Sequence, residues 1–128
     1  MCLRLLLALA FVLIAACSDP RAQARDRLHG VDRQHLRLDA ARLYKQLYAA
    51  TGPEFIILKQ AQWPEAFRAL KPIRIGCYRD GFSLALADDS ANEAGLHIQP
   101  LGITHPPIAG KLTYERLEEG IYWYSLKK

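Results

Sequence analysis

An apolar run at the start of the chain most limits what this sequence can fold into. One positive charge, on Arg4, precedes the uncharged residues Leu5 to Ala16. At a rise of about 1.5 Å per residue, a helix of this length covers about 18 Å, well short of a bilayer core. The charge and the short run are typical of a signal peptide that is removed on export. A cleaved secretory signal without lipid, or an uncleaved buried helix, is the alternative.

The residues that end this run resemble the lipobox of bacterial lipoproteins. Ile14, Ala15 and Ala16 place a branched apolar residue and two small residues directly before Cys17. The resemblance implies that residues 1–16 are cleaved and that the new N-terminal Cys17 is acylated, and several lipid chains make such an anchor stable. Lipoproteins retained in the inner membrane typically carry Asp at the next position. Ser18 stands there in this chain, which implies an outer-membrane anchor facing the periplasm.

Cleavage at this position would leave a single free thiol. Removing 16 of the 128 residues leaves 112, enough for one compact domain. Cys2 is lost with the signal and Cys17 is acylated, so Cys77 has no partner for an intramolecular disulfide. The apolar core alone must therefore hold the fold in an oxidising compartment.

Basic residues outnumber acidic ones in the part of the chain nearest the membrane. From Cys17 to Ala50, seven Arg and Lys face four Asp, whereas nine face nine from Thr51 onward. The excess can lie against anionic headgroups or form a solvated surface. Residues 17–31 contain few large aliphatic side chains and predict a tether without a core of its own. An exported chain does not meet cytosolic nucleic acid, so no nucleic-acid partner is expected.

Residues 32–128 predict a single α+β domain that starts with an amphipathic helix. Asp32 can cap this helix, which should continue to about Ala50 and end at Gly52 and Pro53. Arg37 and Arg42 fall largely outside its apolar stripe. The stripe has helical spacing and should pack on a sheet; it consists of Leu36, Ala40, Leu43, Tyr44, Leu47 and Tyr48.

The rest of the domain predicts a mainly antiparallel sheet of about five strands with one short inserted helix. Pro64 suits the first position of that helix, which should reach Leu70. Asp80 and Gly81 supply the turn of the clearest hairpin, and its alternation places Cys77 on the core face. Asp88 to Gly95 is expected to be a polar loop. Six segments can supply these strands: 55–58, a continuous apolar run that predicts a short buried strand, and 73–77, 82–86, 96–98, 112–117 and 121–126.

A thiol nucleophile is the sharpest catalytic hypothesis. Cys77 and His97 both lie on predicted strands, and a Cys–His pair would increase the thiolate fraction. The alternation, however, buries Cys77 among apolar neighbours, which should raise its pKa and make it inert. His97 lies between Leu96 and Ile98 and is expected to be a half-exposed strand residue.

Other chemistries have weaker support. The four histidines lack the close spacing of a metal site, and only His97, His105 and the Asp88-Asp89 loop could cluster. No serine lies in a G-x-S-x-G context, Ser83 included. Three carboxylates, on Glu115, Glu118 and Glu119, flank a glycine turn and should be solvent-exposed, which suits them poorly to acid catalysis. No metal and no cofactor is predicted.

The most distinctive stretch of the sequence is aromatic. Alternation sends Ile121 and Trp123 to one side of the last strand and Tyr122 and Tyr124 to the other. One side fills the core, and the second packs under a helix or is exposed as an aromatic patch, the composition found at interfaces. If a partner binds, Tyr122 and Tyr124 are the candidates, together with Tyr114 on the adjacent strand.

A weaker resemblance covers about residues 54–126. A Trp-Pro short helix, a D-G hairpin, a Gly-Leu-x-Ile strand and a terminal G-I-Y-W-Y strand occur in the order seen in small uncharacterised bacterial proteins, some of which look like immunity proteins that block a toxin. This likeness implies no active site and identifies no domain family. We expect a non-enzymatic, membrane-tethered binding or structural module of the cell envelope with a protein partner. The alternatives are a lipid-anchored immunity protein and a small thiol-dependent enzyme using Cys77.

Overall fold

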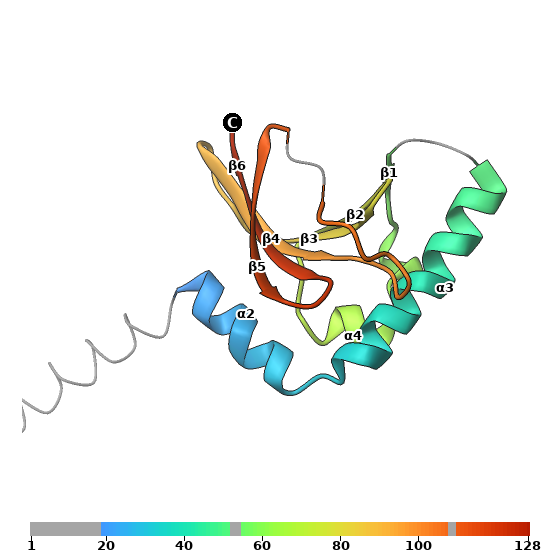
Figure 1. Cartoon of the computed structure of the whole chain (residues 1–128). Coiled ribbons are helices and arrows are strands. Elements are labelled where there is room, and N and C mark those ends of the chain that lie inside the picture. The colour runs from blue at the N-terminus through green and yellow to red at the C-terminus, as the bar shows by residue number, and fades with distance from the viewer. Residues whose placement is uncertain (1–18, 52–54, 108–109) are drawn as a thin grey trace, which may run out of the picture.

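The fold is α+β, with helices packed on one face of an open, six-stranded antiparallel sheet (Figure 1). The computed structural model describes residues 19–51, 55–107 and 110–128, so the predicted signal peptide, Cys17 and Ser18 lie outside the described residues. The predicted α+β class and the antiparallel sheet are confirmed, with six strands rather than about five. Among the helices that the structure describes, none is both long and apolar enough to cross a membrane.

Two antiparallel hairpins in the sheet follow the alternation in the sequence. The strands are β1 Ile56–Ile57, β2 Arg74–Tyr78, β3 Gly81–Asp88, β4 Asn92–Ile98, β5 Leu112–Glu118 and β6 Ile121–Lys127. The strand order is β1-β2-β3-β4-β6-β5. Gly81 closes the β2–β3 turn, where a side chain would approach the Ile98 carbonyl oxygen to 2.6 Å. Gly120 closes the β5–β6 turn with a positive φ of 70°.

Two strands differ from their predicted form. The segment 88–95 is not a long polar loop, because the Asp89 carboxylate accepts hydrogen bonds from the amides of Ala91 (2.8 Å) and Asn92 (2.7 Å) and β4 begins at once. The run at 55–58 is not a buried strand. It forms a short edge strand that leaves Phe55 and Ile57 about half exposed (47% and 49%).

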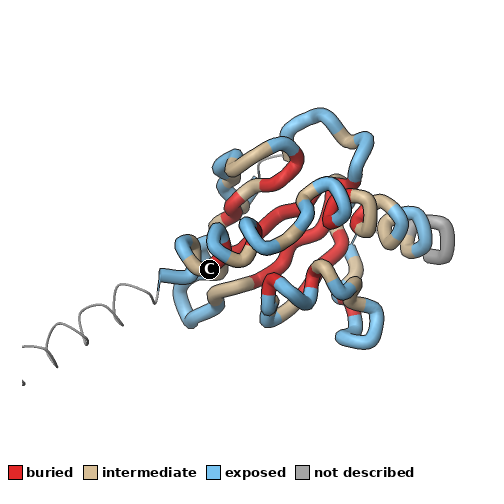
Figure 2. Tube along the Cα trace, turned by 90° about the horizontal axis from the view of Figure 1, so that it is seen from below, coloured by how far each residue is buried: buried red, intermediate tan, exposed pale blue. Residues whose placement is uncertain are grey.

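The core lies between the helices and one face of the sheet. Strands β2, β3, β4 and β6 turn alternate apolar side chains toward it, and Figure 2 shows these buried segments behind the helices. Helix α3, Arg33–Thr51, is capped by Asp32, whose carboxylate accepts from the amides of Gln34 and His35. Its Leu36 and Ala40 are buried, whereas the side chain of Tyr48 lies outside the described part. Pro64 is the cap, not the first residue, of the short helix α4, Glu65–Arg68, which buries Phe67.

The sequence predicts a tether over residues 17–31, and the structure corrects this prediction for most of them. Pro20–His29 forms helix α2, capped by Asp19, and buries Ala24 and Leu28 in the same core. Two buried apolar residues at i and i+4 are enough to hold this helix on the domain because polar contacts also hold it there. Arg21 forms an ion pair with Glu115 on β5, and Arg27 donates to the Leu70 carbonyl oxygen at 3.2 Å. The packed domain therefore begins near residue 19 rather than at 32.

Candidate functional site

The sheet face opposite the helices carries aromatic rings over a row of small residues. Gly76, Ser83, Ala85 and Gly95 occupy its central strands. A methyl group on Gly76 would lie 3.1 Å from the Phe55 ring, so the lack of a side chain makes room for the rings. The ring pairs, by centroid distance, are Phe55–Tyr78 at 4.9 Å, His97–Tyr114 at 5.2 Å and Tyr114–Tyr122 at 6.3 Å.

Two of the three tyrosines expected to bind a partner meet on this face. Tyr114 and Tyr122 are half-buried with their rings in contact, and burial, reinforced by Asp80, raises the pKa of Tyr114 to about 12. Tyr124 points to the same face but is only 2% exposed. Its hydroxyl donates to Glu93 at 3.2 Å, and burial raises its pKa above the ordinary range. Tyr124 thus supports the face from within.

Tyr114 stands between two neighbouring cavities. The first has a volume of about 370 Å³ and the second about 380 Å³, within the range of small-molecule and peptide side-chain sites. The first is lined by Tyr78, Arg79, Asp80, Gly110, Lys111, Leu112 and Tyr114. The second is lined by Gln99, Ile103, Thr104, Pro106, Tyr114, Arg116, Glu119, Gly120 and Tyr122. Tyr114 is therefore a wall of both.

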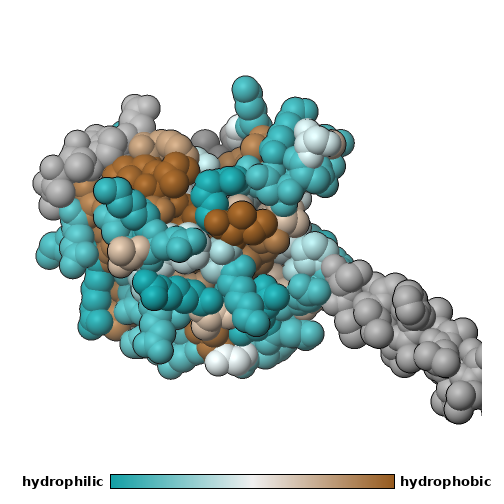
Figure 3. Space-filling model, turned by 180° about the vertical axis from the view of Figure 1, so that it is seen from behind, coloured by the Kyte–Doolittle hydropathy of each residue, from teal (hydrophilic) through white to brown (hydrophobic). Residues whose placement is uncertain are grey.

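The aromatic face continues toward the β1 edge of the sheet. Phe55 packs on Tyr78, and beyond it Ile57, the cross-strand partner of Gly76, leaves about half of its surface in solvent. Figure 3 shows hydrophobic areas exposed between hydrophilic side chains on the rear of the molecule. The helix-free face thus combines partly open aromatic rings with aliphatic surface at its border.

Behind the Tyr114 ring lies a buried polar cluster that sequence reasoning missed. Ser83 and His97 are cross-strand partners, with Ser83 Oγ 3.0 Å from His97 Nδ1. His97 Nε2 lies 3.5 Å from Asp80 Oδ1. His97 is fully buried rather than half-exposed, and burial lowers its pKa although Asp80 opposes this effect. The β3–β4 register brings Asp80, Ser83 and His97 together, and their positions in the sequence do not predict this contact.

These residues have the composition of a Ser–His–Asp triad but not its accessibility. Ser83 Oγ could pass a proton to His97, with Asp80 orienting the ring as in a hydrolase. Ser83, however, is only 6% exposed and His97 is completely enclosed. An acyl substrate could not reach the hydroxyl without opening the sheet face. The cluster therefore ties the β2–β3 turn to β4 and supports the Tyr114 ring from below.

The structure separates the proposed Cys77–His97 pair. Cys77 is buried on the helix side of the sheet, as predicted. His97 pairs with Ser83 and lies on the opposite face. Burial raises the pKa of the Cys77 thiol to about 12. Within the described ranges no three His, Cys, Asp or Glu side chains are grouped as a metal site. Asp88, which could have joined such a cluster, instead forms ion pairs with Arg74 and Lys128.

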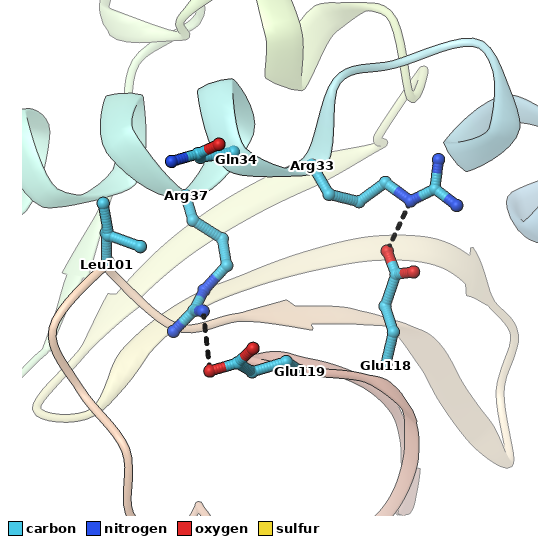
Figure 4. Close-up of a pocket in the computed structure, with 6 residues that line it drawn as sticks. All are labelled: Arg33, Gln34, Arg37, Leu101, Glu118 and Glu119. Atoms are coloured by element: carbon cyan, nitrogen blue, oxygen red, sulfur yellow. Dashed lines mark hydrogen bonds and ion pairs between the residues drawn. The ribbon is translucent and has the colours of Figure 1, made fainter.

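A further cavity lies between α3 and the β5–β6 turn, and its main feature is structural (Figure 4). Arg37 is not on a solvent-facing side of the helix but is 7% exposed. Its guanidinium donates to three carbonyl oxygens of the loop after β4, those of Gln99 (3.1 Å), Pro100 (3.3 Å) and Ile103 (3.2 Å). Because residues of this loop line the second cavity, Arg37 fixes one of that cavity's walls.

Three of the basic residues between Cys17 and Ala50 lie against carboxylates of β5 and the turn that follows it. Arg33 Nε lies 2.7 Å from Glu118, and Arg37 lies 4.0 Å from Glu119 (Figure 4). With the Arg21–Glu115 pair, these contacts neutralise part of the positive charge of α2 and α3 at β5. Glu115 and Glu118 thus help to hold the two helices against the sheet, whereas Glu119 is 81% exposed.

No protein-family model matches this chain, nor does any curated protein or solved structure.

Proposed function

We propose that the protein is a non-enzymatic binding module of the bacterial cell envelope, and that Tyr114 and Tyr122 form the centre of its binding face. The carrying observation is the position of Tyr114, whose ring separates two cavities on the helix-free side of the sheet. Partly exposed tyrosines supply large contact area and a polar hydroxyl at little cost in side-chain entropy. Such rings beside preformed cavities suit recognition of a partner.

The same geometry favours binding over covalent chemistry. The Cys77 thiol is enclosed in the core and carries a raised pKa of about 12, so it is protonated at neutral pH. A buried, protonated thiol is neither nucleophilic nor accessible. The Ser83 hydroxyl, although next to His97, is also enclosed. These observations weigh against the thiol-dependent enzyme and against a serine hydrolase.

We further propose that acylated Cys17 holds this module to the outer membrane, facing the periplasm. Because α2 packs on the domain, only Ser18 and Asp19 separate Cys17 from the first packed helix. Three residue steps extend at most about 10 Å, so the domain would lie beside the bilayer rather than far from it. In this proposal α2 and α3 form a fixed layer beneath the sheet, and the aromatic face is free for a membrane-proximal partner.

Crosslinking in cells that express the full chain, followed by detergent extraction and capture of the protein, tests this function. We expect a defined partner band that is lost with Tyr114→Ala or Tyr122→Ala. Leu101→Ala is the matched control, because Leu101 is an exposed hydrophobic residue of the Arg37 cavity. Melting curves must show that the variants fold. Capture of no partner, or equal capture by all variants, would contradict the proposal.

The identity of the partner decides whether the narrower role applies. If the captured protein is a toxin, and deletion of this gene is lethal only when that toxin is present, the module is an immunity protein. Growth unaffected by the deletion excludes that role and leaves the general binding function standing.

A further inference from the structure

Strand β5 forms one open edge of the sheet beside the proposed binding face. It is last in the strand order and pairs with β6, while no other strand of the described chain lies along its outer side. Its seven residues leave a row of backbone N–H and C=O groups available on that side. An extended segment of another protein can pair with such an edge by main-chain hydrogen bonds.

The two cavities are arranged along β5 in the period of a strand. Leu112 and Tyr114 line the first cavity, and Tyr114 and Arg116 line the second. Leu112, Tyr114 and Arg116 are each two residues apart along β5, so their side chains project to one face at intervals of about 7 Å. A strand paired beside β5 presents its own alternate side chains at the same interval. Consecutive same-face side chains of a partner therefore match the spacing of the two cavities.

Unpaired positive charge surrounds these cavities. Arg79 and Lys111 line the first cavity and Arg116 the second, and all three side chains are exposed. Within the described residues no ion pair or hydrogen bond engages their charged groups. By contrast, Arg21 and Arg33 form ion pairs on the helix side of the same strand. Charges beside an open edge oppose indiscriminate strand pairing and require a complementary partner.

Acidic groups near the cavities do not cancel this charge. Asp80 is mostly buried and faces His97 at 3.5 Å. Glu119 lines the second cavity and is 81% exposed, with the Arg37 guanidinium 4.0 Å away, so three cations face two carboxylates along the two cavities. A ligand that enters beside Tyr114 therefore meets aromatic rings and an excess of positive charge.

We infer that the partner supplies an extended acidic peptide segment that pairs with the outer edge of β5, places alternate side chains in the cavities on either side of Tyr114, and sets its carboxylates against Arg79, Lys111 and Arg116. This inference rests on the proposed binding function and gives it a chemistry. Specificity comes from the charges and rings, and much of the affinity comes from main-chain hydrogen bonds.

A labelled eight-residue peptide of alternating Glu and Val, titrated against the full chain by fluorescence anisotropy, tests the inference. We expect saturable binding that weakens at least about tenfold when Lys replaces each Glu, and that weakens similarly with Arg116→Glu. Lys45→Glu on α3 is the matched control, since Lys45 is also exposed but lies away from the cavities; it should leave binding unchanged.

Backbone methylation of the peptide distinguishes strand pairing from a charge effect. One set of alternate amides should point toward β5 and the other toward solvent. N-methylation of one set should abolish binding, and N-methylation of the other should be tolerated. Equal effects of the two sets, equal binding of the Lys peptide, or binding only to vesicles rich in anionic lipid would overturn the inference.

Failure of the inference can be separated from failure of the proposed function. A cellular partner that is lost with Tyr114→Ala but retained with Arg116→Glu overturns the acidic-strand inference and supports the binding function. Absence of any Tyr114-dependent partner overturns both.

Discussion

Replacing Arg37 with alanine should destabilise the protein strongly, although Arg37 lies on a helix where the sequence pattern marks it as peripheral. The change removes three charge-assisted hydrogen bonds to the carbonyl oxygens of Gln99, Pro100 and Ile103. Gln99 and Pro100 are buried, so water cannot easily replace the lost donor there, whereas Ile103 is half-buried. An unsatisfied buried carbonyl costs about 1–3 kcal/mol, and we expect a total loss of about 3 kcal/mol in unfolding free energy.

Urea denaturation followed by the fluorescence of Trp63 and Trp123 measures this loss. For a domain of this size, a loss of about 3 kcal/mol also lowers the melting temperature by on the order of 10 °C. Arg42→Ala is the control: its side chain is 68% exposed and lies 3.9 Å from Asp39, so its removal should change stability by less than about 0.5 kcal/mol. Equal effects of Arg37→Ala and Arg42→Ala would refute the structural role assigned to Arg37.

Three further predictions concern the turn at Gly120, the buried histidine and the core thiol. Gly120→Ala should destabilise the fold by about 1–3 kcal/mol in thermal melts, because φ is +70° and a methyl group would overlap the Arg37 guanidinium; an unchanged melting temperature would contradict this. Burial lowers the pKa of His97 from its ordinary 6.5, so the folded state holds it neutral. The stability from this residue is present above the ordinary pKa and is lost as the pH falls below it, because the unfolded chain takes up a proton that the folded state does not. His97→Asn should therefore weaken the dependence of the unfolding free energy on pH between about pH 7.5 and 5.5. The same pH dependence in the wild type and the variant, measured by urea denaturation, would count against it. Cys77 should react with iodoacetamide only after denaturation, and mass spectrometry of the folded protein would reveal the contrary.

The strand pattern was predictable because side-chain alternation and turn residues act over short distances. The β2–β3 hairpin around Gly81 and the β5–β6 hairpin around Gly120 follow from that local chemistry. Helix α2 was not predicted, because its apolar content is low and its packing depends on contacts with β5 and with Leu70, far away in the sequence. A local pattern does not contain such partners.

The candidate site was predictable only in part for the same reason. Alternation identified Tyr114 and Tyr122, yet it could not separate them from Tyr124, which points to the same face but is buried and donates a hydrogen bond to Glu93. The contact of His97 with Ser83 required the β3–β4 register. Arg37 required knowledge of where the loop after β4 returns to α3. Long-range pairing, more than residue type, determined these outcomes.

Site-specific photocrosslinking tests the central claim most directly. A photoreactive amino acid replaces Leu112, which lines the first cavity, or Leu101, which is exposed near Arg37, in full-length protein expressed in cells. If the aromatic face is the binding surface, irradiation should join the position 112 protein to one defined partner and leave the position 101 protein free. The account is contradicted if position 112 yields no adduct in folded protein, or if both positions capture the same partner equally.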